Sequence, residues 1–379
     1  MRKTFADFYG QPKDVKEVWA DAYFSFDSSF LLELFDLSAK TRDECIKLLS
    51  SIPREKRFLT FQAAREYHSG VRGVIQKHKN RKAEVDKITG GVTLPGFSSL
   101  SKNESFFSAD PDEVFGAHAA ILKEPIEQWK KSITATVANL VKQYENDCQV
   151  TKKDIADAFD GCVAEPFDDD WLLEKHAIAV VRADSRIPPG YADKESGNKG
   201  LNPYGDVLMW FELLEETERR KKPLIFVTKD SKGDWFAKDE NKRILHPRPE
   251  LATEMQRVAK QRFILYEFHD FLTTAPSYLG KGVAISESGL KEIAEAEIVS
   301  RARKQRWREL MQESKELEEE VRKLDARIAS YENSATLWTE SANDAHQFRL
   351  KRRASLHKRI DEITEEQLEM FNQEVGFDD

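Results

Sequence analysis

Short apolar runs that predict β-strands alternate with amphipathic patterns that predict helices along residues 1–280. One run ends just before Asp27, and the others cover Phe58 to Thr60, Leu224 to Thr228 and Arg262 to Phe268. Strands that alternate with helices favour a mainly parallel sheet that is covered on both faces. The pattern therefore predicts an α/β fold.

One long stretch lacks strand-type runs. From about residue 79 to residue 175 the apolar residues recur at helical spacing, most regularly from Val114 to Asp147. Such spacing is typical of amphipathic helices. We therefore predict a helical insertion at about 79–175, inside an α/β domain that covers residues 1–280.

The composition changes after about residue 290 to Glu, Lys, Arg, Ala and Leu. A seven-residue spacing relates Leu310, Leu317, Leu324 and Tyr331, with Val321 and Ile328 between them, and it predicts a coiled-coil extension over 290–379. A second helix from Gln347 to Phe371 could fold back on the first through Leu350, Leu356, Ile360 and Ile363. Alternatively, each helix could pair with a second chain, and the sequence leaves both arrangements open.

Composition narrows the classes of function. The net charge is −8, which argues against a generally basic nucleic-acid coat but leaves room for a local basic patch. The three cysteines are far apart and show no metal-ligand spacing, so we expect neither a zinc site nor a disulfide framework. No apolar run approaches the roughly 20 residues that span a bilayer. We expect a cytoplasmic protein that does not enter membranes.

Five acidic residues are the candidates for chemistry: Asp27, Glu66, Asp206, Asp230 and Asp234. The first and fourth directly follow apolar strands, and sites in open parallel sheets form beyond the carboxyl ends of the strands. Converging carboxylates repel one another unless a cation lies between them. Because Mg²⁺ and Mn²⁺ prefer oxygen ligands, the pattern indicates a metal site.

Each of these acids also has a purely structural interpretation. Asp27 and Asp206 could cap helices, because aspartate accepts N–H bonds at that position. Glu66 could be an exposed helix residue, and Asp230 and Asp234 could be ordinary turn residues.

Other chemistries lack their motifs. The acidic run 168–170 is more typical of a helix cap than of a metal site. The histidines show no paired helical spacing with a glutamate, and a Gly-rich phosphate loop and a Gly-x-Ser-x-Gly elbow are both missing from the sequence. The cations that could contact phosphates near the acids are Arg65, Arg72, Lys229 and Lys232, and the basic run 349–359 is either a solvated face or a further contact with a nucleic-acid backbone.

Four segments in this order resemble the PIN-like nucleases, most closely the larger bacterial PIN-like domains: "FDSSFLLELF", "AAREYHSGVRG", "YGDVLMWFELL" and "IFVTKDSKGDWF". They place an aspartate after the first strand, a glutamate on a helix, an aspartate opening a later helix, and a threonine-to-aspartate turn. Ser28 and Ser29 stand where the family more often has threonine and asparagine. The resemblance covers about residues 20–275 and implies a three-layer α/β/α fold.

The resemblance also implies a function. It implies a metal-dependent endoribonuclease that uses Mg²⁺ or Mn²⁺, with all five acids as metal-binding and catalytic residues and RNA as the partner. Toxins and antiphage defence effectors are among the roles that it suggests. Two alternatives stay open: a non-catalytic PIN-like interaction module that assembles or binds a partner protein through its C-terminal helices, and a structure-selective DNA nuclease, with single-stranded DNA as the partner in place of RNA.

Overall fold

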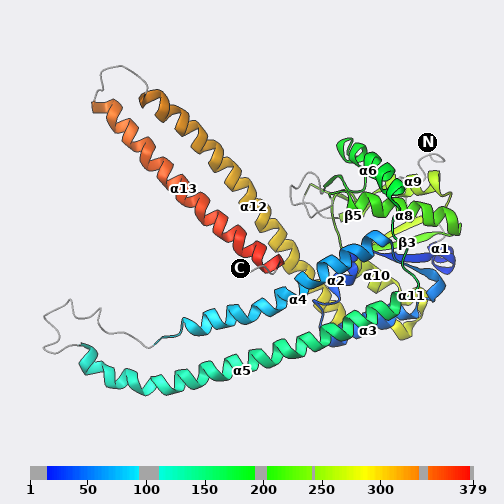
Figure 1. Ribbon diagram of the computed structural model, residues 1–379, viewed down its shortest axis with the longest axis horizontal. Helices are drawn as coiled ribbons and strands as arrows, with labels where there is room; N and C mark the ends of the chain where they lie inside the picture. The colour runs from blue at the N-terminus through cyan, green and yellow to red at the C-terminus, as the bar shows by residue number, and fades with distance from the viewer. Residues whose placement is uncertain (1–14, 94–110, 193–202, 241–243, 333–339, 376–379) are drawn as a thin grey trace. The chain divides into compact units, whose positions relative to one another are not determined.

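The structure is a computed structural model that describes residues 15–93, 111–192, 203–240, 244–332 and 340–375. The chain divides into two compact units. The first comprises residues 1–75 and 135–293, and the second comprises residues 76–134 and 294–379. Figure 1 labels most of the helices and some of the strands of both units.

A four-stranded parallel sheet forms the centre of the first unit. Its strands are β1 (Tyr23–Phe26), β2 (Arg57–Phe58), β3 (Leu224–Thr228) and β6 (Phe263–Glu267), in the order β2-β1-β3-β6. Every residue of β1 and β3 is buried. The predicted strand from Leu224 to Thr228 is thus confirmed to the residue. Its apolar run from Leu224 to Val227 is the pattern expected of a strand that is covered on both faces.

One face of the sheet packs on α8 (Gly205–Arg220). The hydroxyl group of Tyr23 lies 2.7 Å from Thr217 Oγ1, and the rings of Trp210 and Phe263 lie 5.2 Å apart. Register places Tyr23, Leu224 and Phe263 side by side, so α8 covers the row that these three residues form.

The opposite face packs on α1 (Val15–Asp21) and α10 (Phe268–Thr274). Phe271 lies at its centre, in ring contact with Trp19, Phe24, Phe26 and Phe30. The adjoining helices are α2 (Ser28–Glu33), α3 (Ala39–Ser51) and α11 (Pro276–Leu279). Helices on both faces confirm the three-layer α/β/α fold.

Past β3, the chain forms a small antiparallel pair that the sequence pattern did not reveal. It comprises β4 (Phe236–Lys238) and β5 (Ile244–Pro247), and α9 (Pro249–Val258) follows. Both strands are short and only partly buried, so neither shows the period-two alternation that predicts a strand.

The predicted insertion is mostly helical among its described residues, except for a turn at 91–93 and the irregular segment 160–168, where Val163 forms a β-bridge with Leu59. It contains the end of α4 (Phe61–Gly90), all of α5 (Pro111–Phe159) and the start of α6 (Asp169–Asp184). Residues 94–110, where the sequence indicated a loop, lie outside the described residues. Asp168 caps α6 by accepting a bond from Trp171 N at 2.7 Å, as the acidic run predicted.

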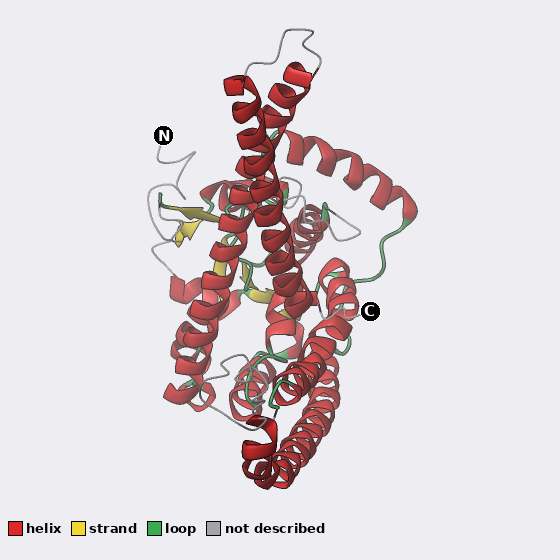
Figure 2. Ribbon diagram, turned by 90° about the vertical axis from the view of Figure 1, so that its left-hand side faces the viewer, coloured by secondary structure: helices red, strands yellow, loops and turns green. Residues whose placement is uncertain are grey.

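In the second unit, α12 (Glu287–Glu332), from residue 294 onward, and α13 (Glu340–Val375) lie side by side as an antiparallel pair, which Figures 1 and 2 both show. Ion pairs join Arg306 to Glu366, Glu313 to Arg359 and Glu320 to Arg352. The buried seam comprises Leu310, Val321, Ile328, Leu356 and Ile363. Of the two arrangements that the sequence left open, the structure contains the one in which a single chain folds back. No helix of the described residues is long and apolar enough to cross a membrane.

Candidate active site

Asp27 lies at the carboxyl end of β1, where three hydroxyl groups orient its side chain. Thr228 Oγ1 donates to Asp27 Oδ2 at 2.8 Å, and Ser29 Oγ donates to the same oxygen. Ser28 Oγ lies 3.3 Å from Oδ1. The carboxylate makes no capping bond to α2, although Asp27 occupies the N-cap position. Its hydrogen bonds therefore hold it at the sheet edge, and the two serines supply the orienting groups.

Burial and like charge both act on Asp27, which is 6% exposed. Burial raises the pKa of its carboxyl group, and the nearby charge of Asp206 raises it further, while the bonds from Ser29 and Thr228 oppose the rise. Asp230 adds a smaller effect in the same direction as Asp206. An ionised Asp27 is thus destabilised here unless a cation is near.

Asp206 and Asp230 share one cation, the ammonium group of Lys232. Lys232 Nζ lies 3.4 Å from Asp206 Oδ2 and 2.6 Å from Asp230 Oδ2. Trp235 Nε1 donates to Asp206 Oδ2 at 3.2 Å. Asp206 lies in the first turn of α8, whose N-cap is Tyr204, so Asp206 is not the capping residue.

The turn interpretation of Asp230 holds in part. Its Oδ1 accepts from Lys232 N at 3.0 Å, and its own N–H donates to Thr228 Oγ1 at 2.8 Å. Since Thr228 also binds Asp27, the turn after β3 fixes Asp230 relative to the end of β1.

Glu66 faces the same edge from α4. Ser28 Oγ lies 3.0 Å from Glu66 Oε2, and Gln62 Nε2 donates to Oε1. Burial raises the pKa of Glu66 to about 7, and the charges of Asp27 and Asp206 contribute. It is therefore coupled to the other acids and is not an isolated helix residue.

Asp234 is completely buried and holds a loop. Its Oδ2 accepts from Gly190 N at 2.7 Å and from Ala192 N at 3.2 Å. Within the described chain, its Oδ1 has no hydrogen-bond partner. Burial raises the pKa of Asp234, and the charge of Asp206 raises it further. Asp234 therefore interacts electrostatically with the site, although its hydrogen bonds are made to the loop.

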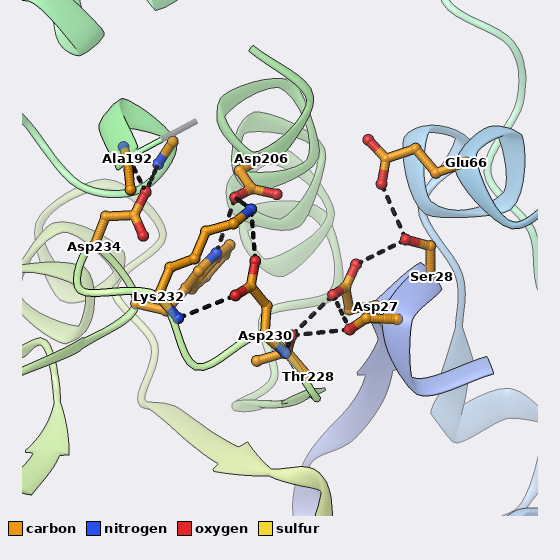
Figure 3. Close-up of polar contacts among 12 residues, drawn as sticks. Asp27, Ser28, Glu66, Ala192, Asp206, Thr228, Asp230, Lys232 and Asp234 are labelled. Atoms are coloured by element: carbon orange, nitrogen blue, oxygen red, sulfur yellow. Dashed lines mark hydrogen bonds and ion pairs between the residues drawn. The ribbon is translucent and has the colours of Figure 1, made fainter. Parts of the chain in front are cut away.

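Figure 3 shows the carboxylates of Asp27, Glu66, Asp206 and Asp230 turned toward one another, with Asp234 at the side of Asp206. As arranged here, no three His, Cys, Asp or Glu side chains among the described residues could hold one metal ion. The donor set nevertheless fits a hard divalent cation, because all the groups are carboxylates, and burial together with the neighbouring charges raises the pKa values of Asp27 and Glu66. The ammonium group of Lys232 forms ion pairs with two of these carboxylates, those of Asp206 and Asp230.

Residues that support the acids cannot be predicted from the sequence when their partners are distant in the chain. Glu212 on α8 accepts from Phe61 N at 2.7 Å and from Gln62 N at 3.0 Å, so it binds the start of the helix that carries Glu66. The pair is separated by about 150 residues, and no local pattern predicts it.

The candidate phosphate contacts lie in different surroundings. Lys229 pairs with the buried Glu33, and Lys232 bridges two of the acids. Arg65 bonds to Gln62, and Arg72 is exposed.

A parallel sheet with acids from a strand end, two helices and a turn at its carboxyl edge defines an α/β domain with an acidic site. The PIN like domain family model matches residues 23–251, more than half of the chain, and the chain belongs to this family. Domains of this family are generally nucleases. No curated protein and no solved structure matches the chain in the comparisons made.

The raised pKa of Glu66 predicts how stability depends on pH without divalent ions. Between its ordinary value of 4.5 and about 7, the folded protein keeps a proton that the unfolded chain has released, so the free energy of unfolding should fall as pH rises through this window. Glu66→Gln should reduce that fall in thermal melts recorded in EDTA between pH 5 and 7.5. The exposed Glu55→Gln should leave it unchanged, and a Glu66→Gln slope equal to that of the wild type would contradict the prediction.

Proposed function

We propose that this protein is a metal-dependent endoribonuclease that hydrolyses RNA phosphodiester bonds at the carboxyl edge of its sheet. The observation that carries the proposal is the meeting of Asp27, Glu66, Asp206 and Asp230 there, from four separate elements. Such a group is costly to bury without a cation, and oxygen donors select Mg²⁺ or Mn²⁺.

The acidic residues would have different roles at the metal site. Asp27, Asp206 and Asp230 would hold the ion directly, and Glu66 and the unbonded Oδ1 of Asp234 would hold a second ion or its water ligands. A bound divalent ion supplies a water of lowered pKa and neutralises charge on the phosphate and the leaving oxygen. Thr228 would keep two of these ligands in register, because its hydroxyl group bonds to both Asp27 and Asp230.

Lys232 would change partners when an ion and a substrate bind. Its ammonium group lies between two carboxylates, 2.6 Å and 3.4 Å away. With the charges of Asp206 and Asp230 compensated by a bound ion, Lys232 would be available to a phosphate oxygen of the substrate.

The test compares cleavage of labelled RNA and labelled single-stranded DNA by purified protein with Mn²⁺, with Mg²⁺ and with EDTA. We expect RNA to be cut with either ion and to stay intact in EDTA. Cleavage of DNA alone would favour the DNA nuclease. Intact substrates under all conditions, with no rise in melting temperature on adding Mn²⁺, would refute the nuclease and favour the interaction module.

A further inference from the structure

A second feature of the first unit lies on the helix that carries Glu66. A shallow, open cavity of about 530 Å³ is lined by Phe61, Ala64, Arg65, His68 and Ser69 from α4 and by Val163, Ala164 and Pro166 from the segment after α5. Its volume falls within the range of small-ligand sites. None of these residues belongs to the acidic group described above.

The cavity lies at the same edge of the sheet as the acids. Leu59 follows β2 and forms a parallel bridge with Val163, with Leu59 N donating to Cys162 O at 2.8 Å and Ala164 N donating to Leu59 O at 2.9 Å. The wall formed by Val163 and Ala164 therefore extends the sheet past the carboxyl end of β2, and β2 is the neighbour of β1.

A hydrogen-bonded chain joins the cavity to the acidic site. Arg65 Nη2 donates to Gln62 Oε1, and Gln62 Nε2 donates to Glu66 Oε1. Gln62 is 1% exposed and uses both ends of its amide group, so it sets the positions of Arg65 and Glu66 relative to each other.

The lining has the chemistry of a nucleotide site. Phe61, Ala64 and Val163 contribute an apolar floor, and Val163 is 43% exposed although it is hydrophobic. Arg65 brings a cationic guanidinium group to its margin, and His68 brings an imidazole ring. An apolar surface with a cation beside it complements a flat base that carries a phosphate.

Aromatic packing keeps Arg65 beside this floor. Phe167 lies edge-on to Phe61 with ring centroids 5.0 Å apart, and it stacks on Trp171 at 4.6 Å. The guanidinium group of Arg65 lies 5.8 Å from the Phe167 ring centroid. The arginine is therefore held by a ring contact and by Gln62 together.

We propose that this cavity binds one unpaired base of a single-stranded RNA substrate and that Arg65 contacts the adjoining phosphate. The inference rests on the proposed function, since it assigns the cavity to the strand whose phosphodiester is cut. It makes the protein selective for unpaired RNA, because a base inside a duplex cannot leave its stack without cost.

The experiment measures binding without cleavage. Fluorescence anisotropy in EDTA, in an Asp206→Asn background, compares a labelled single-stranded oligoribonucleotide with one of the same length that lacks its bases. Val163→Glu, which places a negative charge on the floor, should weaken binding of the intact strand roughly tenfold and binding of the baseless strand much less. Arg65→Met should weaken both. Val181→Glu on α6 is the matched control, since Val181 is 61% exposed and lies outside the cavity, and it should bind like the background protein.

Each outcome decides one claim. If the protein with intact acids cleaves RNA, but Val163→Glu and Arg65→Met bind RNA as the background protein does, the cavity assignment is overturned. The proposed nuclease function is then unaffected. Equal loss for intact and baseless strands in Val163→Glu overturns base binding. If the parent with intact acids neither binds nor cleaves RNA, the proposed function fails with it. Circular dichroism and melting temperature verify that each variant is folded.

Discussion

Asp27→Asn and Asp206→Asn should each reduce RNA cleavage at least about 100-fold. Each would remove a direct metal ligand, and the loss of a residue that only supports such a ligand already costs up to about 100-fold. Each change removes a negative charge from the acidic group and keeps the shape of the side chain. An amide oxygen also remains at position 206 to accept the bond from Trp235. The variants should therefore fold normally and fail at the chemical step.

Stability separates this prediction from simple unfolding. Since Asp27 is buried and repelled by Asp206, replacing either charge should leave the metal-free protein at neutral pH as stable as the wild type, or more so. The rise in melting temperature on adding Mn²⁺ should shrink in both variants, because less ion binds the folded state. Cleavage rates and melts with and without Mn²⁺ give both quantities. Asp157→Asn, at an exposed position in α5, is the matched control, and full activity in either site variant would disprove the assignment.

Arg182→Met should lower the free energy of unfolding by about 3 to 5 kcal/mol, the usual cost of breaking a buried ion pair by removing one partner. The side chain of Arg182 is 9% exposed and donates to both oxygens of Glu254, at 2.7 and 2.8 Å. It also donates to Pro188 O, while Trp210 donates to Glu254 at 2.8 Å. The network ties α6 and α9 to the loop that Asp234 holds.

Urea denaturation measures this change, and two comparisons sharpen it. Replacing both partners, as Arg182→Met with Glu254→Met, should recover much of the loss because no unpaired charge remains. Arg54→Met should cost at most about 1 kcal/mol, since Arg54 and Asp160 form an exposed pair with side chains 60% and 78% exposed. A loss for Arg182→Met no larger than that for Arg54→Met would show that the network does not stabilise the fold.

The same network predicts a pH effect of known sign. Burial alone would raise the pKa of Glu254, but the hydrogen bond and charge of Arg182 and the bond from Trp210 lower it below its ordinary value. The stabilisation is therefore present above pH 4.5 and is lost as pH falls through the lower folded value. The loss caused by Arg182→Met should shrink in acid.

Features that depend on neighbours in the chain could be predicted from the sequence. The strand from Leu224 to Thr228 was apparent because burial on both faces requires an unbroken apolar run. The seven-residue spacing located the helix whose buried seam includes Leu310 and Val321. The acids after β1 and β3 were apparent because a charge can follow a buried strand only where the strand leaves the core.

Contacts between distant segments were decided by the tertiary structure alone. The sequence did not show that Ser28 lies between Asp27 and Glu66, or that Glu212 binds the start of α4. It proposed Asp234 for the metal, whereas the fold also gives that carboxylate two backbone N–H groups from a loop more than 40 residues away.

The sequence by itself determined the periodicities, the strand ends and the candidate acids of this protein, because each depends on whether successive side chains face a core or water. The tertiary structure decided the strand order, the choice of a folded-back α12 and α13 pair, and the partners of each acid. These depend on which distant surfaces bury each other, and a single chain's local pattern is compatible with several such arrangements. Gln62 is polar yet buried, and the reason is apparent only in the tertiary structure, where its amide group bonds to both Arg65 and Glu66.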